Sequence, residues 1–298
     1  MNRREFLAAS AAVPFAVRAR SVQGPVVLVT CDAESRLAVV DLHTLRVVGS
    51  IRTTGDPRSV ERVGDVALVC HTAEGAVSIV DRTRVRRIVR GFVEPRYAAA
   101  HPDGIHAFVT DSGRSSVVLV DTRRGAIVAR VRLPGWARHV TISRDGSRLW
   151  AGLGSASEHV AVVSTTPLRH VGNLTPGFLA HDVGLAPDGR LWVTSGSARV
   201  LAAGSRRLDA DRSPQHVTFG NGRVFVTSGD SGTLHVQAHD GRVLLRTSVP
   251  IGSYNVQYAA GHVVTPSLLH GTLAVLDAHG QPLRTLQVSG SCHDACVL

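Results

Sequence analysis

Short apolar runs separated by turn-forming residues recur along the chain from about residue 24 to its end. One repeat shows the pattern, with runs at Arg138–Ser143, Leu149–Gly152 and Val160–Val163 and a turn at Arg144–Gly146. Short runs of this kind, bounded by Gly, Asp and Pro, are typical of β-strands, and apolar residues nowhere recur with the spacing of a helix. The pattern therefore predicts an all-β protein.

Turn signals repeat with the strands. Their Asp-Gly, Asn-Gly or Ala-Gly pairs supply the positive φ angles that tight hairpins require. They are Pro102–Gly104, Arg144–Gly146, Pro187–Gly189, Asn221–Gly222 and Ala260–Gly261. The third strand of a repeat often ends in an aspartate, and these residues are Asp41, Asp81, Asp121 and Asp277. We expect each to accept a hydrogen bond from the backbone two residues on and so to set the next turn.

A short phrase with two variable polar positions begins each repeat. Its seven copies are Pro57–Val60, Pro95–Ala98, Ala137–Val140, Ala180–Val183, Pro214–Val217, Ser253–Val256 and Cys292–Ala295. Counted from Arg58 to His293, successive copies lie 38, 42, 43, 34, 39 and 39 residues apart. A period near 40 with four short strands per repeat is typical of a β-propeller.

Seven phrases predict seven blades, but the first strand after the N-terminal segment, Val26–Thr30, matches the second strand of a repeat. The first blade therefore lacks its innermost strand, and the C-terminal phrase supplies it. We predict that residues 20–298 form a single domain, a seven-bladed β-propeller with four-stranded blades. The C-terminal strand joins the N-terminal blade and closes the ring. The fifth blade, 180–213, is the shortest, with weak third and fourth strands around 199–207.

This pattern of phrases, turns and strands resembles the YVTN-type (YncE-like) seven-bladed propeller repeat. The resemblance rests on Pro-x-x-Val at Pro57–Val60, Pro-Asp-Gly at Pro102–Gly104 and Val-Ile-Asp-like ends such as Ile79–Asp81, and it covers nearly everything after residue 24. It implies the propeller fold. It does not select a function, because propellers of this kind include binding modules, lactonases, lyases and cofactor-bearing dehydrogenase subunits.

The first nineteen residues differ from the repeats. Arg3 and Arg4 precede Phe6 and an Ala-rich apolar run that ends at Ala19, which resembles a twin-arginine export signal. We therefore expect residues 1–19 to be a signal peptide and the folded propeller to be exported, to the periplasm or outside the cell. The alternative is a disordered start that contains Arg-Arg by chance. No other apolar run approaches membrane length, so we expect no membrane span after signal removal.

The chain is basic, with a net charge of +10, and because it contains no Lys all 33 basic residues are Arg. Many fall in the last strand of a repeat, as at Arg84–Arg90 and Arg130–Arg132, where charge protects an exposed sheet edge from pairing. A nucleic-acid partner would need this charge gathered on one face with aromatic platforms. Aromatic residues make up only 4%, so nucleic acid is an unlikely partner by composition.

The four cysteines are disulfide candidates, because an exported protein meets an oxidising compartment. In the closed first blade Cys292 should lie beside Cys31, and we predict that the two form a disulfide that locks the ring. A second bond, between Cys70 and Cys296 on adjacent blades, requires that these side chains face each other, which the pattern does not decide.

The phrases should gather their variable residues at one mouth of the central channel. In chain order the pairs are Arg58 and Ser59, Arg96 and Tyr97, Arg138 and His139, His181 and Asp182, Gln215 and His216, Tyr254 and Asn255, and His293 and Asp294. Three consecutive blades contribute Arg, whose guanidinium groups suit a carboxylate or phosphate. The residues expected to bind an anionic ligand are Arg58, Arg96, Tyr97, Arg138, His139, His216, Tyr254 and Asn255.

The histidines of the phrases have two further possible roles. His139, His181, His216 and His293 are candidate metal ligands. His181 or His293 with Asp182 or Asp294 has the chemistry of a general base oriented by a carboxylate. The simpler alternative is that these groups only hydrogen-bond loop backbone and channel water. No motif requires a cofactor, since the chain has no Cys-x-x-Cys-His, Gly-rich phosphate loop or Gly-x-Ser-x-Gly.

Three functions follow in order of preference. The first is an exported binding or scaffold module whose channel mouth holds an anionic small molecule or an acidic segment of a protein partner. The second is a hydrolase resembling the propeller lactonases, with His181, Asp182, His293 and Asp294 as catalytic candidates. The third is a metal- or cofactor-holding redox subunit.

Overall fold

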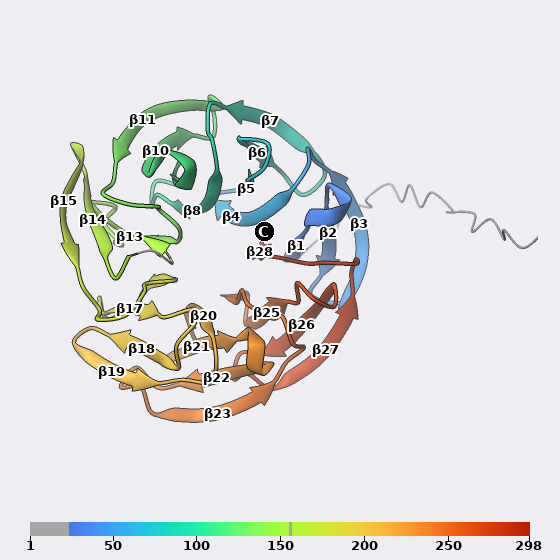
Figure 1. The fold of residues 1–298 in the computed structure, drawn as a ribbon. Helices are drawn as coiled ribbons and strands as arrows, with labels where there is room; N and C mark the ends of the chain where they lie inside the picture. The colour runs from blue at the N-terminus through green and yellow to red at the C-terminus, as the bar shows by residue number, and fades with distance from the viewer. Residues whose placement is uncertain (1–23, 155–156) are drawn as a thin grey trace, which may run out of the picture.

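The structure, a computed structural model, describes residues 24–154 and 157–298. Within these residues the chain forms seven four-stranded antiparallel sheets arranged in a ring (Figure 1). The predicted seven-bladed, all-β fold is confirmed. The predicted signal segment, 1–19, lies outside the described residues. No helix in the described ranges is long and apolar enough to cross a membrane.

Blades 2 to 4 each contain four strands that are consecutive in the chain. Blade 2 is β4 (Pro57–Val63), β5 (Val66–His71), β6 (Ala76–Val80) and β7 (Val85–Arg90). Blade 3 is β8 (Pro95–Ala100), β9 (His106–Asp111), β10 (Ser116–Asp121) and β11 (Ala126–Arg132). Blade 4 is β12 (Val140–Ile142), β13 (Arg148–Gly152), β14 (Val160–Thr165) and β15 (Leu168–Leu174).

Blades 5 to 7 repeat this order. Blade 5 is β16 (Val183–Leu185), β17 (Leu191–Thr194), β18 (Val200–Ala203) and β19 (Arg206–Asp209). Blade 6 is β20 (Pro214–Gly220), β21 (Arg223–Ser228), β22 (Thr233–Gln237) and β23 (Val243–Ser248). Blade 7 is β24 (Gln257–Ala259), β25 (His262–Pro266), β26 (Thr272–Asp277) and β27 (Pro282–Gln287). The weak strands expected in blade 5 are β18 and β19, each four residues long.

Blade 1 is assembled from both ends of the chain. It contains β1 (Val26–Cys31), β2 (Arg36–Asp41) and β3 (Arg46–Arg52), and β28 (Ala295–Val297) is its innermost strand. β28 pairs with β1 in antiparallel register, Val27 with Val297, Leu28 with Cys296 and Val29 with Ala295. The C-terminus thus lies near the centre of the ring, as Figure 1 shows. The predicted closure is confirmed.

Each junction between neighbouring blades holds one apolar cluster. Between blades 1 and 2, for example, Leu28 and Leu37 pack against Val60 and Val69. The inner and middle strands are apolar on both faces because both faces are covered by neighbouring blades. The outermost strands instead carry exposed charges, such as Arg86 and Arg87 in β7.

The aspartates that end the third strands set the turns as predicted. Asp41, for example, accepts the backbone N–H of His43 at 2.8 Å, and Asp121 accepts that of Arg123 at 2.9 Å. Equivalent bonds follow Asp81 and Asp277. These carboxylates therefore belong to the turns and not to the channel.

The predicted disulfide between Cys31 and Cys292 is absent, and all four cysteines are free thiols. Cys31 and Cys292 do lie together as expected, and the hydrogen bond from Cys292 lowers the pKa of the Cys31 thiol to about 7. Cys70 and Cys296 do not face each other. Cys70 points into the junction between blades 2 and 3, whereas Cys296 points into the junction between blades 1 and 2. The sheet of blade 2 separates the two thiols.

Candidate functional site

The innermost strands of the blades line a central cavity of about 390 Å³. Side chains alternate along each strand, so the second variable residue of a phrase faces the cavity and the first stands at its mouth. Of the second-position residues, those that line the cavity are Tyr97, His139, Asp182, His216, Asn255 and Asp294. A second hollow of about 210 Å³ beside the mouth is lined by Arg138, His181 and Gly196, among others.

Around the mouth, one side-chain hydrogen bond links each blade to the next, which gives a ring of seven such bonds. The backbone carbonyl at the first phrase position always accepts from a side chain of the preceding blade. The donors, in order, are Thr30, Ser59, Thr110, His139, Thr194, Thr227 and Asn255, and the acceptors are the carbonyls of Arg58, Arg96, Arg138, His181, Gln215, Tyr254 and His293. The side-chain amide of Asn255, which was expected to bind ligand, therefore links blade 7 to blade 1.

Asp182 and Asp294 occupy equivalent places and bind backbone in the same way. Each carboxylate accepts one N–H from its own strand and one from the innermost strand of the next blade. The donors are Val183 and Val217 for Asp182, at 2.8 and 3.0 Å, and Ala295 and Val60 for Asp294, at 2.8 and 2.9 Å. Burial raises the pKa of both groups to about 7 against the lowering effect of these bonds.

Three arginines gather at the mouth on blades 2, 3 and 4. The Nε atoms of Arg58, Arg96 and Arg138 are buried and have no hydrogen-bond partner. Arg96 forms an ion pair with Glu94, and its guanidinium group lies 4.4 Å from the centre of the Trp136 ring. Arg138 lies 5.7 Å from the same ring. Burial and the charges of Arg96 and Arg58 lower the pKa of Arg138, so the three cations lie close enough to repel one another.

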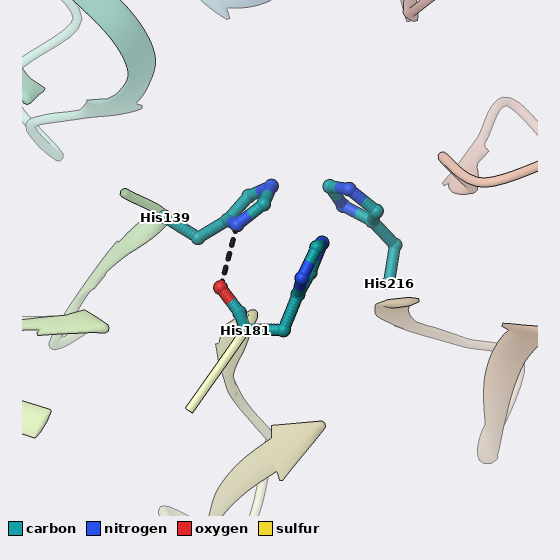
Figure 2. Close-up of side chains that lie close together, drawn as sticks. All are labelled: His139, His181 and His216. Carbon is teal, nitrogen blue, oxygen red and sulfur yellow. Dashed lines mark hydrogen bonds between the residues drawn. The ribbon is translucent and has the colours of Figure 1, made fainter. Parts of the chain in front are cut away.

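Three histidines meet on the adjoining wall (Figure 2). One ring nitrogen of each of His139, His181 and His216 lies within 4.8 Å of the corresponding atoms of the other two. The ring of Tyr97 lies against that of His139, tilted by 33° with 3.6 Å between the centroids. Burial holds the pKa of all three histidines well below its usual value, with the neighbouring charges adding to the effect. The rings are therefore neutral near pH 7.

His293 and Tyr254, two other predicted site residues, lie apart from this group. His293 contacts Asn255 and is not part of the histidine group. The Tyr254 hydroxyl group donates to Asp230 at 3.0 Å, on the loop between β21 and β22. Tyr254 therefore faces a neighbouring loop, and it does not line the central cavity.

The histidine–aspartate pairs expected for a hydrolase are not brought together in the predicted way. Asp182 lies 3.5 Å from His216 of the next blade, and His181, its neighbour in sequence, points to the histidine group. Both oxygens of Asp294 accept backbone N–H groups, whereas His293 contacts Asn255. Adjacent residues of an extended strand point in opposite directions. This explains why the side chain of His181 does not contact that of Asp182 and the side chain of His293 does not contact that of Asp294, although each pair is adjacent in the sequence.

Sequence reasoning missed three residues of this site. Glu61 and Gln257 line the cavity two residues beyond Ser59 and Asn255, and the alternation of side chains along a strand would have indicated both. Trp136, which directly precedes the third phrase, Ala137–Val140, forms the aromatic surface between Arg96 and Arg138. Only its position beside the phrase could have pointed to it.

Fold and site together define a seven-bladed β-propeller with a cationic channel mouth and a channel wall of histidines and carboxylic acids. Neither a model of a known protein family nor a curated protein sequence matches the chain.

Solved structures do resemble the chain. Hydrazine synthase of Kuenenia stuttgartiensis is similar with a TM-score of 0.74 and 18% identity, over 85% of this chain and 92% of that one. A functionally unknown protein from Desulfotomaculum acetoxidans DSM 771 has a TM-score of 0.78 and 12% identity, over 91% and 98%. Dihydro-heme d1 dehydrogenase NirN in complex with DHE has a TM-score of 0.65 and 12% identity, over 89% and 73%. At these identities the likeness concerns the fold alone.

Proposed function

We propose that this propeller is a binding module that holds a small carboxylate-bearing molecule at its channel mouth. The observation that carries the proposal is the group of Arg58, Arg96 and Arg138, whose buried Nε atoms have no partner. Guanidinium groups bind carboxylates through two parallel hydrogen bonds, which makes them the side chains best suited to this ligand.

The charges at the mouth are unbalanced. Glu94 pairs with Arg96, but within residues 24–154 and 157–298 no carboxylate forms an ion pair with Arg58 or Arg138. The nearby Asp182 and Asp294 have pKa values raised to about 7, so a fraction of each is uncharged at neutral pH. Half-buried cations without counter-charges favour the binding of an anion.

Trp136 holds two of the three arginines in place. The Arg96 and Arg138 guanidinium groups both lie near its ring. Gly154 makes room for this ring, since a Cβ at that position would lie 2.2 Å from one of its carbon atoms. Cation–π contacts fix the direction of the guanidinium groups before a ligand arrives. Such preorganisation lowers the entropy cost of binding.

The proposal predicts that di- and tricarboxylates such as succinate and citrate bind the purified protein, measured by isothermal titration calorimetry at fixed ionic strength. Replacing Arg138 by Met keeps much of the side-chain volume but removes the charge and the fork of donors. We expect Arg138→Met to weaken binding by about tenfold or more, since a charge-assisted hydrogen bond contributes roughly 1.5–3 kcal/mol.

Arg132→Met is the matched control, because Arg132 is exposed on the outermost strand β11. It should bind the carboxylates as the wild type does. Equal loss in both variants would show that net charge alone attracts the anion. Absence of binding to every carboxylate tested would contradict the proposal, and tighter binding of an acidic peptide would identify a protein partner as the ligand of the same arginines.

We also propose that the repeats are of the YVTN type and that the chain is exported through the twin-arginine route. The Pro-Asp-Gly turns support the first statement, and Arg3 and Arg4 ahead of an apolar run support the second. N-terminal sequencing of the exported protein checks the export signal. A mature chain that begins at Arg20 is expected, and an uncleaved chain retained in the cytoplasm would refute it.

A further inference from the structure

Three histidines from consecutive blades converge on one point of the channel wall (Figure 2). His139 precedes β12, His181 precedes β16 and His216 lies in β20, and one nitrogen of each lies within 4.8 Å of the others. Their backbone positions are fixed by the inner strands of blades 4, 5 and 6. We propose that these three side chains hold one divalent transition-metal ion.

His139 is already in the form that a metal ligand needs. Its Nδ1 lies 2.7 Å from the backbone carbonyl oxygen of His181. A carbonyl oxygen only accepts hydrogen bonds, so Nδ1 carries the proton and Nε2 keeps its lone pair. That Nε2 atom is buried and has no hydrogen-bond partner. An imidazole held by a carbonyl at one nitrogen and free at the other is the usual arrangement around bound metals.

The surroundings of the other two rings also suit metal ligands. The Nδ1 atom of His216 lies 3.5 Å from a carboxyl oxygen of Asp182, so a small shift of the ring would form the carboxylate–histidine hydrogen bond often found behind a metal ligand. The Nε2 atom of His181 is also buried without a partner. Gly196 leaves room for this ring, because a Cβ there would lie 2.3 Å from the Nδ1 atom of His181.

The donor set indicates the class of ion. Imidazole nitrogens suit Zn²⁺, Co²⁺, Ni²⁺ and Cu²⁺, whereas Mg²⁺ and Ca²⁺ prefer oxygen ligands. A Zn–N bond of about 2.0–2.1 Å sets the nitrogens roughly 3.4 Å apart in a tetrahedral site, so a shift of about 1 Å closes the present arrangement. Three protein ligands leave a further coordination position open. The metal site does not depend on the anion-binding proposal.

The test uses the purified full-length protein, produced without a histidine tag and treated with a chelator. It is titrated with CoCl₂, whose visible absorption reports the coordination number, and bound Zn²⁺ is counted by elemental analysis after dialysis against ZnCl₂. We expect one ion per chain, with the Co²⁺ spectrum of a four- or five-coordinate site.

His139→Asn is the informative variant. Asn255 holds the equivalent place in blade 7 and donates through its amide nitrogen to the next blade, so Asn at position 139 can keep the bond to His181 while the Nε2 ligand is lost. We expect Zn²⁺ to bind this variant about a hundredfold more weakly or worse. His216→Asn, which leaves the hydrogen bond of His139 intact, should behave alike. If thermal melting shows one variant unfolded, the other decides.

His293→Asn is the matched control, a change to another channel histidine outside the group, and it should bind Zn²⁺ as the wild type does. Three results would overturn the site. They are a wild-type protein that binds less than one ion per chain, a His139→Asn and His216→Asn double variant that binds as tightly as the wild type, or an equal loss in His293→Asn.

Discussion

Glu61 lies in the channel, where ionisation is unfavourable. It lines the cavity beyond the ring of phrase residues, and it accepts a long hydrogen bond of 3.5 Å from the amide of Gln257. Burial, with a further contribution from the charge of Asp294, raises the pKa of Glu61 to about 8. The folded protein therefore keeps a proton on Glu61 at neutral pH.

This proton makes stability depend on pH. The unfolded chain releases it near the ordinary pKa of 4.5, whereas the folded chain retains it up to about pH 8. The folded state then binds more protons than the unfolded state, so the contribution of Glu61 to stability is complete below about pH 4.5 and is lost as the pH rises through about 8.

Glu61→Gln should remove this dependence. The variant should match the wild type near pH 4.5 and become more stable than it as the pH rises, by on the order of 4 kcal/mol at pH 8. Urea unfolding at several pH values measures the difference. Glu74→Gln, at an exposed position, should run parallel to the wild type, and a constant difference for Glu61→Gln across the pH range would contradict the assignment.

At the residue scale, the sequence predicted well which side chains lie at the channel mouth. It predicted less well which of those side chains contact one another. The phrase register placed His139 and His216 on the same face, and the structure agrees. His181 occupies the other register position, and it joins them because Gly196 of the same blade leaves room for its ring. Such a contact depends on packing between distant segments, which the local pattern does not contain.

At the scale of the element, the ring of seven hydrogen bonds explains why the positions around the mouth carry Thr, Ser, His or Asn. Each must donate to a carbonyl of the next blade, and an apolar side chain cannot. The sequence predicted the strands and turns well, since these follow from local alternation and from Gly and Asp. It could not assign the donors, because their acceptors lie in another blade.

Thr110→Val tests the contribution of one such bond. The Thr110 hydroxyl group donates to the carbonyl of Arg138 at 2.6 Å and accepts the N–H of Tyr97 at 3.1 Å. Val has the same shape but leaves both groups without this partner, which should lower the free energy of unfolding by about 1–3 kcal/mol. Urea unfolding provides the measurement. Thr285→Val, on the exposed strand β27, should change it by less than about 0.5 kcal/mol.

At the scale of the whole molecule, closure rests on a single short strand. Beyond the three residue pairs of β28 and β1, Val26 and Leu298 exchange two backbone hydrogen bonds, of 3.0 and 2.9 Å. The side chains of Ala295, Cys296, Val297 and Leu298 are all buried. Counting phrases was enough to predict this closure, whereas the disulfide prediction failed because adjacency of two thiols does not by itself make a bond.

Deletion of 292–298 should therefore prevent folding, seen as loss of soluble protein and of the cooperative thermal transition. A circular permutant is the matched control. It joins Leu298 to Pro25 through a short turn and opens the chain between β3 and β4, at Gly55, so that every strand of the described residues keeps its partners. The permutant should fold with a melting temperature near that of the wild type. A stable truncated protein would refute the role of β28.

The same closure has a mechanical consequence. Val26 begins β1 and Leu298 follows β28, so both free ends leave the antiparallel pair on the same side. Hydrogen bonds in such a pair lie across the strands. A force applied to the two ends therefore breaks these hydrogen bonds one after another. A pull on residues within two opposite blades loads many bonds together. The ring should therefore resist stretching across its diameter far better than stretching from its ends.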